Sequence, residues 1–257
     1  MKFYDLDVKI ADKIAYVLLD RPEANNSFNL NMAQELLYLA NEFIEKDEVE
    51  VIVLGAKGDK FSHGISELDS QLTDELKQTI NLTNEAIKAW AKIPFPVIAS
   101  LQGECNSLGL SLASVADIRF AHIDATFSVP EVKKGLVPGG GITQRLPRII
   151  GKGPAMSMLL SSEAVTAQTG LEWGLINKVV EMGDVWEVAC NQGKRFVEMS
   201  TLSMQYTKEC ILRGSELSFE DGLRLELNMY MLLQTGFDRM EGVNAYLEKR
   251  PAIFKGR

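Results

Sequence analysis

The chain has 257 residues and a formal net charge of −8, and 46% of its residues are hydrophobic. This length allows one large domain or a core with an appendage, and the composition is typical of a soluble globular protein. The acidic balance argues against general nucleic-acid binding. No apolar run approaches the roughly 20 residues of a membrane helix, and the first residues lack a signal-peptide core. We therefore expect a cytoplasmic protein with no membrane partner.

The cysteines and histidines give no sign of a disulfide framework or a metal centre. Cys105, Cys190 and Cys210 are odd in number and widely scattered, which predicts reduced thiols. His63 and His122 are the two histidines, and no carboxylates or thiolates stand near them at ligand spacing. We predict no metal.

In chain order, the first half alternates between strands and helices. This alternation, which continues to about residue 130, predicts a parallel sheet built by crossover connections. The expected elements are strands at 3–10, 13–20 and 49–54, a helix from Met32 to about Asp47, a loop at 58–66 with two glycines, and a helix at 69–92.

The stretch 96–117 reads as a buried strand, a turn at Gly103 and a helix of small residues that reaches Asp117. This helix is apolar or small on every side, which predicts a buried central helix. The first N–H groups of a buried helix need a cap, a water or a ligand. We therefore expect its first turn, 106–109, to be a place that can hold an oxyanion.

Helices dominate the second half of the chain. Capping boxes that start at Ser218 and Thr235 predict the beginnings of the last two helices. The boundaries divide the chain into an α/β core at 1–195 and a helical C-terminal region at 196–257. The expected elements are strands at 117–121, 126–129 and 176–180, and helices at 152–160, 166–173, 184–199, 202–213, 219–233 and 237–249.

Two short motifs favour structural roles. Gly109 to Ala113, with Ser111 between them, is one residue short of a serine-hydrolase nucleophile elbow. A hydrolase would also need a downstream histidine, and His122 is the one available, so we favour a packing role for Ser111. The glycine run 139–141 fails both phosphate-loop patterns and indicates a turn that opens a helix.

Glu131 is the most informative acidic residue. It follows Pro130 as the chain leaves a strand and enters a glycine-rich loop. A carboxylate that a proline fixes among apolar neighbours is suited to proton transfer. The alternative is a solvated loop glutamate.

Taken together, the chain resembles the crotonase, or enoyl-CoA hydratase/isomerase, superfamily over nearly its whole length. No single motif is diagnostic, but their order and spacing are specific. The matching segments are LDRPEANN at 19–26, GDKFSHG at 58–64, PVIASLQG at 96–103, ADIRFA at 116–121, FSVPEVKKGLVPGGGITQRLPR at 127–148, AQTGLEWGLI at 167–176 and EKRPAIF at 248–254.

The resemblance implies a spiral of ββα units assembled as a homotrimer or homohexamer through the helical C-terminal region. It also implies an acyl-CoA thioester substrate, so that coenzyme A is part of the substrate and no separate cofactor is needed. The backbone N–H groups of Ile65 and Leu108 would form an oxyanion hole for the thioester enolate. The implied substrate and CoA contacts are Ala24, Asn26, Ser62, His63, Gly64 and Gly109, with Phe254 and Lys255 from a neighbouring subunit.

The departures from the family pattern bear on the reaction. The family's run of three glycines is Ser107-Leu108-Gly109 here, and Ser111 replaces the first catalytic glutamate of hydratases, whereas Glu131 retains the second. Family isomerases use a single glutamate. We therefore predict a Δ3,Δ2-enoyl-CoA isomerase-type proton shuttle. The alternatives are a hydratase in which Ser111 positions water beside Glu131, and a non-catalytic acyl-CoA binding protein. The bulk of Leu108 and Leu110 suggests a narrowed pocket.

Overall fold

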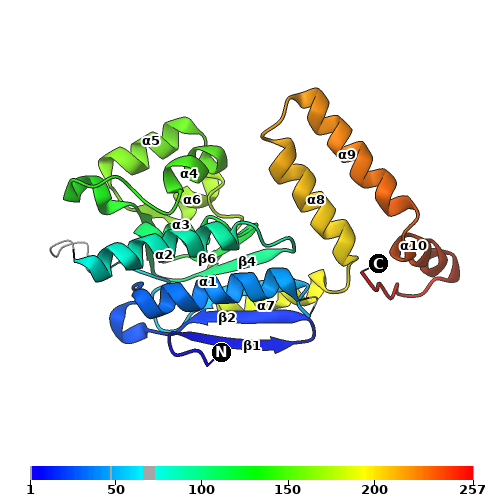
Figure 1. Ribbon diagram of the computed structural model, residues 1–257, viewed down its shortest axis with the longest axis horizontal. Helices are drawn as coiled ribbons and strands as arrows, with labels where there is room; N and C mark the ends of the chain where they lie inside the picture. Colours follow the sequence, from blue (N-terminus) through cyan, green and yellow to red (C-terminus); the bar gives the residue numbers. More distant parts are fainter. Residues whose placement is uncertain (1, 47, 66–72, 257) are drawn as a thin grey trace.

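The computed structural model describes residues 2–46, 48–65 and 73–256 (Figure 1). At its centre is a six-stranded sheet in the order β1-β2-β3-β4-β6-β9. The first pair is antiparallel and the remaining neighbours are parallel, which confirms the predicted parallel sheet. The strands are β1 (Leu6–Ala11), β2 (Ile14–Leu19), β3 (Val51–Ala56), β4 (Val97–Leu101), β6 (Ile118–His122) and β9 (Lys178–Val180).

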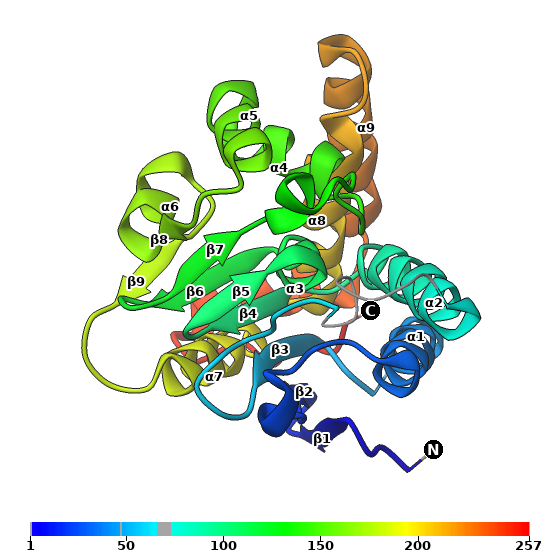
Figure 2. The same cartoon turned by 90° about the vertical axis from the view of Figure 1, so that its left-hand side faces the viewer.

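The sheet is buried on both faces, because alternate residues of its strands enter two separate cores. In β3, Ile52 and Leu54 face the larger core, and Val51 and Val53 face the smaller one. Helices α1 (Leu30–Glu45) and α2 (Asp74–Trp90) cover the first face, and α7 (Val185–Phe196) covers the second (Figures 1 and 2).

Helices α1 and α2 pack closely against each other. Asn29 caps α1 by accepting a hydrogen bond from the backbone N–H of Met32. The Trp90 side chain of α2 donates to the carbonyl of Leu36 (2.9 Å) and meets the Phe43 ring edge to face. The buried face of α1 is the predicted one. The start predicted for α2, residue 69, lies outside the described residues.

A second, three-stranded sheet lies beside the first and leads into the central helix. It consists of β5 (Glu104–Asn106), β7 (Thr126–Ser128) and β8 (Val165–Thr166). The sequence predicted β7 but missed the other two strands, since two or three residues are too few to show an alternating pattern. The central helix α3 (Ser107–Ala113) is buried at every position, as predicted.

Helix α3 is shorter than expected: it ends at Ala113 and not at Asp117. Its last turn tightens, because Ser114 donates its hydroxyl to the carbonyl of Ser111 (2.6 Å). Asp117 is used elsewhere: its carboxylate accepts from the backbone N–H of Val97 and from Lys208. These contacts hold Asp117, the residue before β6, against the start of β4 and against Lys208.

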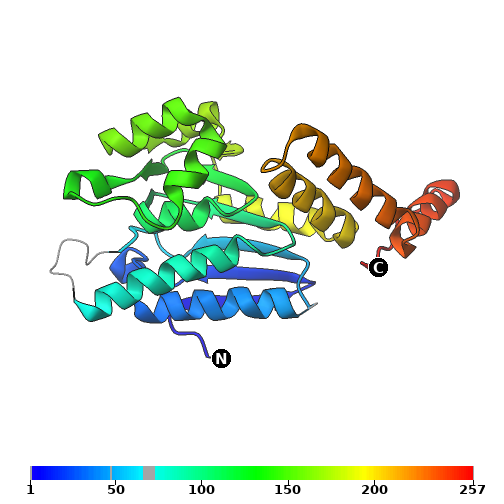
Figure 3. The ribbon, with the colours of Figure 1, turned by 45° about the horizontal axis from the view of Figure 1, so that its top comes forward.

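The remaining helices form two groups. Helices α4 to α6 form the first group, which lies above α3 in Figure 1. Helices α8 to α10 form an arm that extends away from the sheet (Figures 1 and 3). We call α8 to α10 and the tail 249–256 the C-terminal arm. The bounds are η1 (Pro22–Ala24), η3 (Pro130–Lys134), α4 (Ile142–Ile150), α5 (Lys152–Ser161), α6 (Ala167–Trp173), α8 (Thr201–Gly214), α9 (Phe219–Gln234) and α10 (Phe237–Glu248).

One of the two predicted capping boxes is wrong. Ser218 caps α9 as predicted and accepts from the N–H of Asp221. Helix α10, however, has Gly236 at its N-cap rather than Thr235. Asp238 could not close a capping box there, because its buried carboxylate accepts from the Ser200 hydroxyl and from two backbone N–H groups of the tail.

Three further observations concern the sequence predictions. In the part of the chain that the structure describes, no helix is long and apolar enough to cross a bilayer. The three cysteines are free thiols. Burial raises the pKa of the Cys105 thiol well above its ordinary value.

Candidate active site

Three segments meet at the first turn of α3: the loop 61–65, the helix start itself and the short helix η3. Gly64 has a φ of +80°, and a Cβ placed on it would lie 2.5 Å from the Cβ of Ser107 and 3.1 Å from the backbone nitrogen of Leu108. The close approach therefore requires glycine. This confirms the special backbone angle predicted at Gly64, and it brings Ile65 and Leu108 into the same small region.

Asn26 and Ser62 fix this loop from within. The amide of Asn26 accepts from the N–H of Arg21 and donates to the carbonyls of Lys57 and Lys60. The Ser62 hydroxyl donates to the carbonyl of Asn26 and accepts from the N–H of Gly64. Both side chains are buried. Their side chains hold the loop in place, and their contact with CoA stays a prediction.

The outer side of the loop carries charge. His63 donates its backbone N–H to the carbonyl of Asn25, the residue after Ala24, and its exposed imidazole pairs with Glu104. Lys60 lies 3.1 Å from the same carboxylate. Burial opposes ionisation of Glu104, yet the hydrogen bonds from Lys60 and His63 outweigh it, so its pKa lies below the ordinary value. The backbone of His63 is thus joined to the residue after Ala24, and the CoA contacts of Ala24 and His63 stay predictions.

Gly109 lies behind this loop. A Cβ on Gly109 would come within 2.6 Å of the Cβ of Ser62, so glycine lets α3 pack directly on the loop. The structure thus gives Gly109 a packing role. The substrate contact predicted for it is not tested by this geometry.

Glu131 lies on η3, and its carboxylate is buried and only half satisfied. Its Oε1 accepts a hydrogen bond from the Ser107 hydroxyl at 2.5 Å. Its Oε2 is shielded from solvent and has no hydrogen-bond partner. The alternative of a solvated loop glutamate is therefore wrong: the side chain is 3% exposed. A buried carboxylate oxygen without a donor is costly and calls for a functional explanation.

The other buried carboxylates in the described residues differ from Glu131. Both oxygens of Glu35 accept backbone N–H groups, from Tyr4 and Asp5. Both oxygens of Asp238 are likewise engaged, by Ser200 and the tail. Glu35 and Asp238 therefore hold the fold together, whereas Glu131 leaves one oxygen without a donor.

Ser107 was missed as a site residue. It is buried, has a φ of +54° and stands at the first position of α3. Residues with a Cβ rarely adopt this left-handed conformation. The sequence did contain a signal, because Ser107 occupies the first glycine position of the family's three-glycine run. The pattern alone does not show what the hydroxyl contacts.

Ser111 is fully enclosed. Its hydroxyl lies 3.2 Å from the carbonyl oxygens of both Ser107 and Gly139. A Cβ on Gly140, whose φ is +67°, would lie 2.5 Å from the Cβ of Ser111. The turn 139–141 therefore covers Ser111 and opens α4, as predicted for the glycine run. Because the hydroxyl donates to backbone carbonyls, its contacts support a packing role for Ser111 more than a role in positioning water.

Leu108 lies below the same turn. Its Cδ2 would be 2.9 Å from a Cβ on Gly140, and its side chain is buried. Asn106, at the N-cap of α3, makes no side-chain hydrogen bond to the first turn. Its amide instead accepts from Ser128 and donates to Glu104. No side-chain cap thus competes for the Leu108 N–H, the predicted oxyanion donor.

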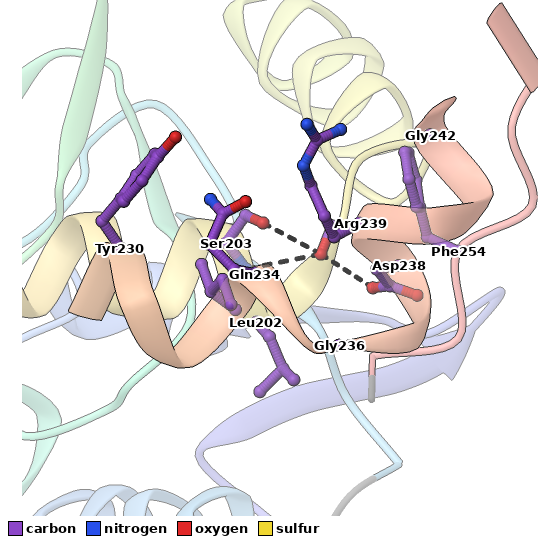
Figure 4. Close-up of a pocket in the computed structure, with 11 residues that line it drawn as sticks. Leu202, Ser203, Tyr230, Gln234, Gly236, Asp238, Arg239, Gly242 and Phe254 are labelled. Atoms are coloured by element: carbon purple, nitrogen blue, oxygen red, sulfur yellow. Dashed lines mark hydrogen bonds between the residues drawn. The ribbon is translucent and has the colours of Figure 1, made fainter. Parts of the chain in front are cut away.

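Phe254 and Lys255 are not brought to Glu131 within one chain. They belong to the tail of the C-terminal arm, and Figure 1 shows the C-terminus beside α10 and away from α3. Lys255 lies 4.7 Å from the centre of the Phe237 ring. Phe254 lines a groove of about 470 Å³ between the arm helices, together with Leu202, Tyr230 and other residues that Figure 4 shows. Any contribution of this tail to the site has to come from another copy of the chain.

Comparison with known proteins supports the sequence analysis. A family model described as enoyl-CoA hydratase/isomerase matches residues 9–257. The chain is 31% identical to the 2,3-dehydroadipyl-CoA hydratase of Escherichia coli, over 98% of this chain and 99% of that one. It is also 31% identical to the short-chain-enoyl-CoA hydratase of Clostridium acetobutylicum, over 93% and 92%.

The structures agree as well. The crystal structure of an enoyl-CoA hydratase from Bacillus anthracis superposes with a TM-score of 0.94 at 27% identity, covering 99% of this chain and all of that one. A putative enoyl-CoA hydratase from Streptomyces coelicolor gives a TM-score of 0.93 at 29% identity, covering 100% of this chain and 96% of that one. The crotonase-type α/β fold and the family resemblance are confirmed.

Proposed function

The chain belongs to the enoyl-CoA hydratase/isomerase family, and from that membership we propose that it shifts the double bond of a β,γ-unsaturated acyl-CoA to the α,β position. It is an enzyme of the hydratase/isomerase type. The isomerase reaction is our proposal. The observation that carries it is the buried carboxylate of Glu131, which has one oxygen without a partner, together with an enclosed serine at position 111.

The proposed chemistry needs one carboxylate. Oε2 of Glu131 removes a proton from the α-carbon, and the electron pair moves through the C2–C1 bond to give a dienolate. The N–H groups of Ile65 and Leu108 stabilise the negative oxygen. The carboxyl group then returns the proton to the γ-carbon, which leaves the double bond between the α- and β-carbons. Proton and electrons balance without a cofactor, and the coenzyme A leaves with the product.

Hydration is the second candidate, and the names of the relatives favour it, since many of them are hydratases. Hydration in this family divides the work between two carboxylates. In this chain, Ser111 takes the position of the first carboxylate, and its hydroxyl lies against two backbone carbonyls. A serine hydroxyl is not basic at neutral pH and cannot take a proton from water as a carboxylate does.

Turnover on two substrates separates these reactions. We expect 3-hexenoyl-CoA to be converted to 2-hexenoyl-CoA at least about tenfold faster than 2-hexenoyl-CoA is hydrated. The reverse order would make the protein a hydratase. A matched Ser111→Ala variant should change neither rate strongly. Loss of hydration on that substitution would instead give the serine a role in positioning water.

We also propose that the chain assembles as a homotrimer or homohexamer through the C-terminal arm. Helix α9 buries none of its residues within one chain. One of its faces carries large exposed apolar side chains at helical spacing, an arrangement that marks an interaction surface. These residues are Phe219, Leu223, Leu227, Tyr230 and Met231. Analytical ultracentrifugation of the full chain tests the assembly, and a monomer at micromolar concentration would contradict it.

A further inference from the structure

The short contact between Ser107 and Glu131 assigns a task to a residue outside the expected set. A carboxylate has two oxygens, and in Glu131 these differ: Oε1 accepts from the Ser107 hydroxyl at 2.5 Å, whereas Oε2 is buried without a partner. A hydrogen bond to an ionised carboxylate is among the stronger ones in proteins. Ser107 therefore divides the carboxylate into a held oxygen and an open one.

The backbone around Ser107 is arranged to make this contact possible. Ser107 stands in the left-handed region, at φ +54°, which disfavours any residue with a Cβ. Directly opposite, Gly64 leaves room for its side chain, because a Cβ on Gly64 would lie 2.8 Å from the Ser107 hydroxyl oxygen. Glycine at 107 would avoid both the unfavourable φ and the crowding against residue 64. The serine is retained at a conformational cost, and its hydroxyl makes a contact that glycine lacks.

The neighbouring serines do not share this contact. Ser111 lies against the carbonyls of Ser107 and Gly139, and Ser114 donates to the carbonyl of Ser111. Both are hydroxyl-to-backbone contacts that hold a helix turn. Ser107 alone among the three serines of α3 and its C-cap reaches the carboxylate.

We propose that Ser107 is a positioning residue: its hydroxyl holds Oε1 of Glu131 so that the carboxylate cannot rotate and Oε2 alone exchanges the proton with the acyl chain. This inference rests on the proposed role of Glu131 as the proton carrier. It applies to the α-proton step in either an isomerase or a hydratase. A fixed carboxylate offers one oxygen in one geometry, which matters most when the same group has to remove a proton and return it elsewhere.

Three substitutions separate the hydroxyl from the backbone strain. Ser107→Gly removes the hydroxyl and suits the positive φ, Ser107→Ala removes it and keeps the strain, and Ser107→Cys keeps a weaker donor. We expect the glycine and alanine variants to lose about tenfold to a hundredfold in kcat alike, with KM within about twofold. The cysteine variant should fall between them and the wild type. If Ser107 were only structural, the glycine variant would be the best tolerated.

Two controls isolate the contact with Glu131. Ser114→Ala removes another buried hydroxyl near the same helix and should leave kcat unchanged. In a Glu131→Gln background, Ser107→Gly should cause no further loss, because the two groups act as one unit. Melting temperatures and CoA binding of each variant report whether the fold is intact.

The deciding measurement is exchange of the α-protons of butyryl-CoA with D₂O, followed by NMR. This reaction needs proton removal alone and no double-bond shift. Exchange that slows at least tenfold in folded Ser107→Gly supports the inference, even if the wild type hydrates rather than isomerises. Exchange and kcat within twofold of wild type in that variant overturn it, even if isomerisation is confirmed. If the wild type neither exchanges nor isomerises, the proposed function fails, and this inference fails with it.

Discussion

The α3 start and the C-terminal arm leave opposite kinds of groups unpaired. The first turn of α3 is buried, and the group without a partner beside it is a polar atom, Oε2 of Glu131. In the arm the buried carboxylate, Asp238, is fully hydrogen-bonded, and the unpaired groups are the apolar side chains of α9. The contrast fits the two proposals made above: an acyl chain with which Glu131 exchanges a proton, and an apolar surface of another subunit against α9.

The largest effect should come from replacing the carboxylate of Glu131. Glu131→Gln keeps the size of the side chain, but an amide cannot accept and return a proton at neutral pH. We expect isomerisation to fall by about a thousandfold or more, whereas CoA affinity, measured by calorimetry, changes little. Activity within tenfold of wild type in the folded variant would show that another group carries the proton.

The second effect concerns the oxyanion donors. Gly64→Val would place a Cβ about where Ser107 now lies, so the loop has to move and the Ile65 N–H with it. We expect a loss of about 3 kcal/mol of transition-state stabilisation, roughly a hundredfold in kcat, with substrate binding weakened much less. Unchanged turnover in a folded variant would exclude Ile65 as a donor. Gly183→Val, at a positive-φ glycine with no neighbour within 4 Å and outside the three segments of the site, is the matched control for backbone strain alone.

The arm side of the comparison predicts a smaller, concentration-dependent effect. Leu227→Asp puts a charge on the exposed face of α9 without touching a buried group. We expect the assembly to dissociate in sedimentation velocity, while the circular dichroism of the chain is retained. Glu220→Gln, in the first turn of the same helix, is the control. An unchanged sedimentation coefficient in Leu227→Asp would place the interface elsewhere.

Deleting residues 251–257 tests whether the tail reaches a neighbouring site. The tail ends beside α10, away from α3 (Figure 1), so a CoA contact of Phe254 or Lys255 has to cross between subunits. We expect the dissociation constant for CoA to rise several-fold. Equal affinity in the truncated protein would rule the tail out. The deletion also removes two backbone N–H groups that donate to Asp238. The melting temperature of the truncated protein therefore has to show that its fold is intact.

The smallest effect should follow from Ser111→Ala. The hydroxyl that is removed contacts only backbone carbonyls, so we expect the isomerisation rate to fall by less than about tenfold, with a modest loss of stability.

Ser111→Glu is the sharper probe. The enclosing turn at Gly140 leaves little room, so the variant should lower the melting temperature and gain hydration only where that turn opens. Strong hydration at an unchanged melting temperature would contradict this packing.

The sequence predicted those features that depend on local pattern. The apolar face of α1, the parallel order of β2 to β6 and the buried character of α3 follow from periodicity. The family motifs singled out Gly64 and Glu131, and both lie against Ser107 in the structure. It missed β8 and placed the cap of α10 one residue early, since both depend on partners far along the chain. Asp238, for example, is occupied by the tail.

The Ser107 contact shows the same limit at the candidate site. Its partner Glu131 is 24 positions away, and a hydroxyl in a left-handed conformation cannot be aimed from spacing alone. Likewise, the sequence could not show that the turn 139–141 encloses Ser111. Residue types and motif order identified the family, whereas the state of each carboxylate oxygen required the packed structure.

The central claim is that one carboxylate, Glu131, carries a proton from the α-carbon to the γ-carbon. The most direct test is a single turnover of 3-hexenoyl-CoA deuterated at C2, with the product analysed by NMR and mass spectrometry. We predict that part of the deuterium appears at C4 of 2-hexenoyl-CoA and that Glu131→Gln abolishes the transfer. A product that carries a hydroxyl from water at C3, with no deuterium at C4, would contradict the account and identify the enzyme as a hydratase.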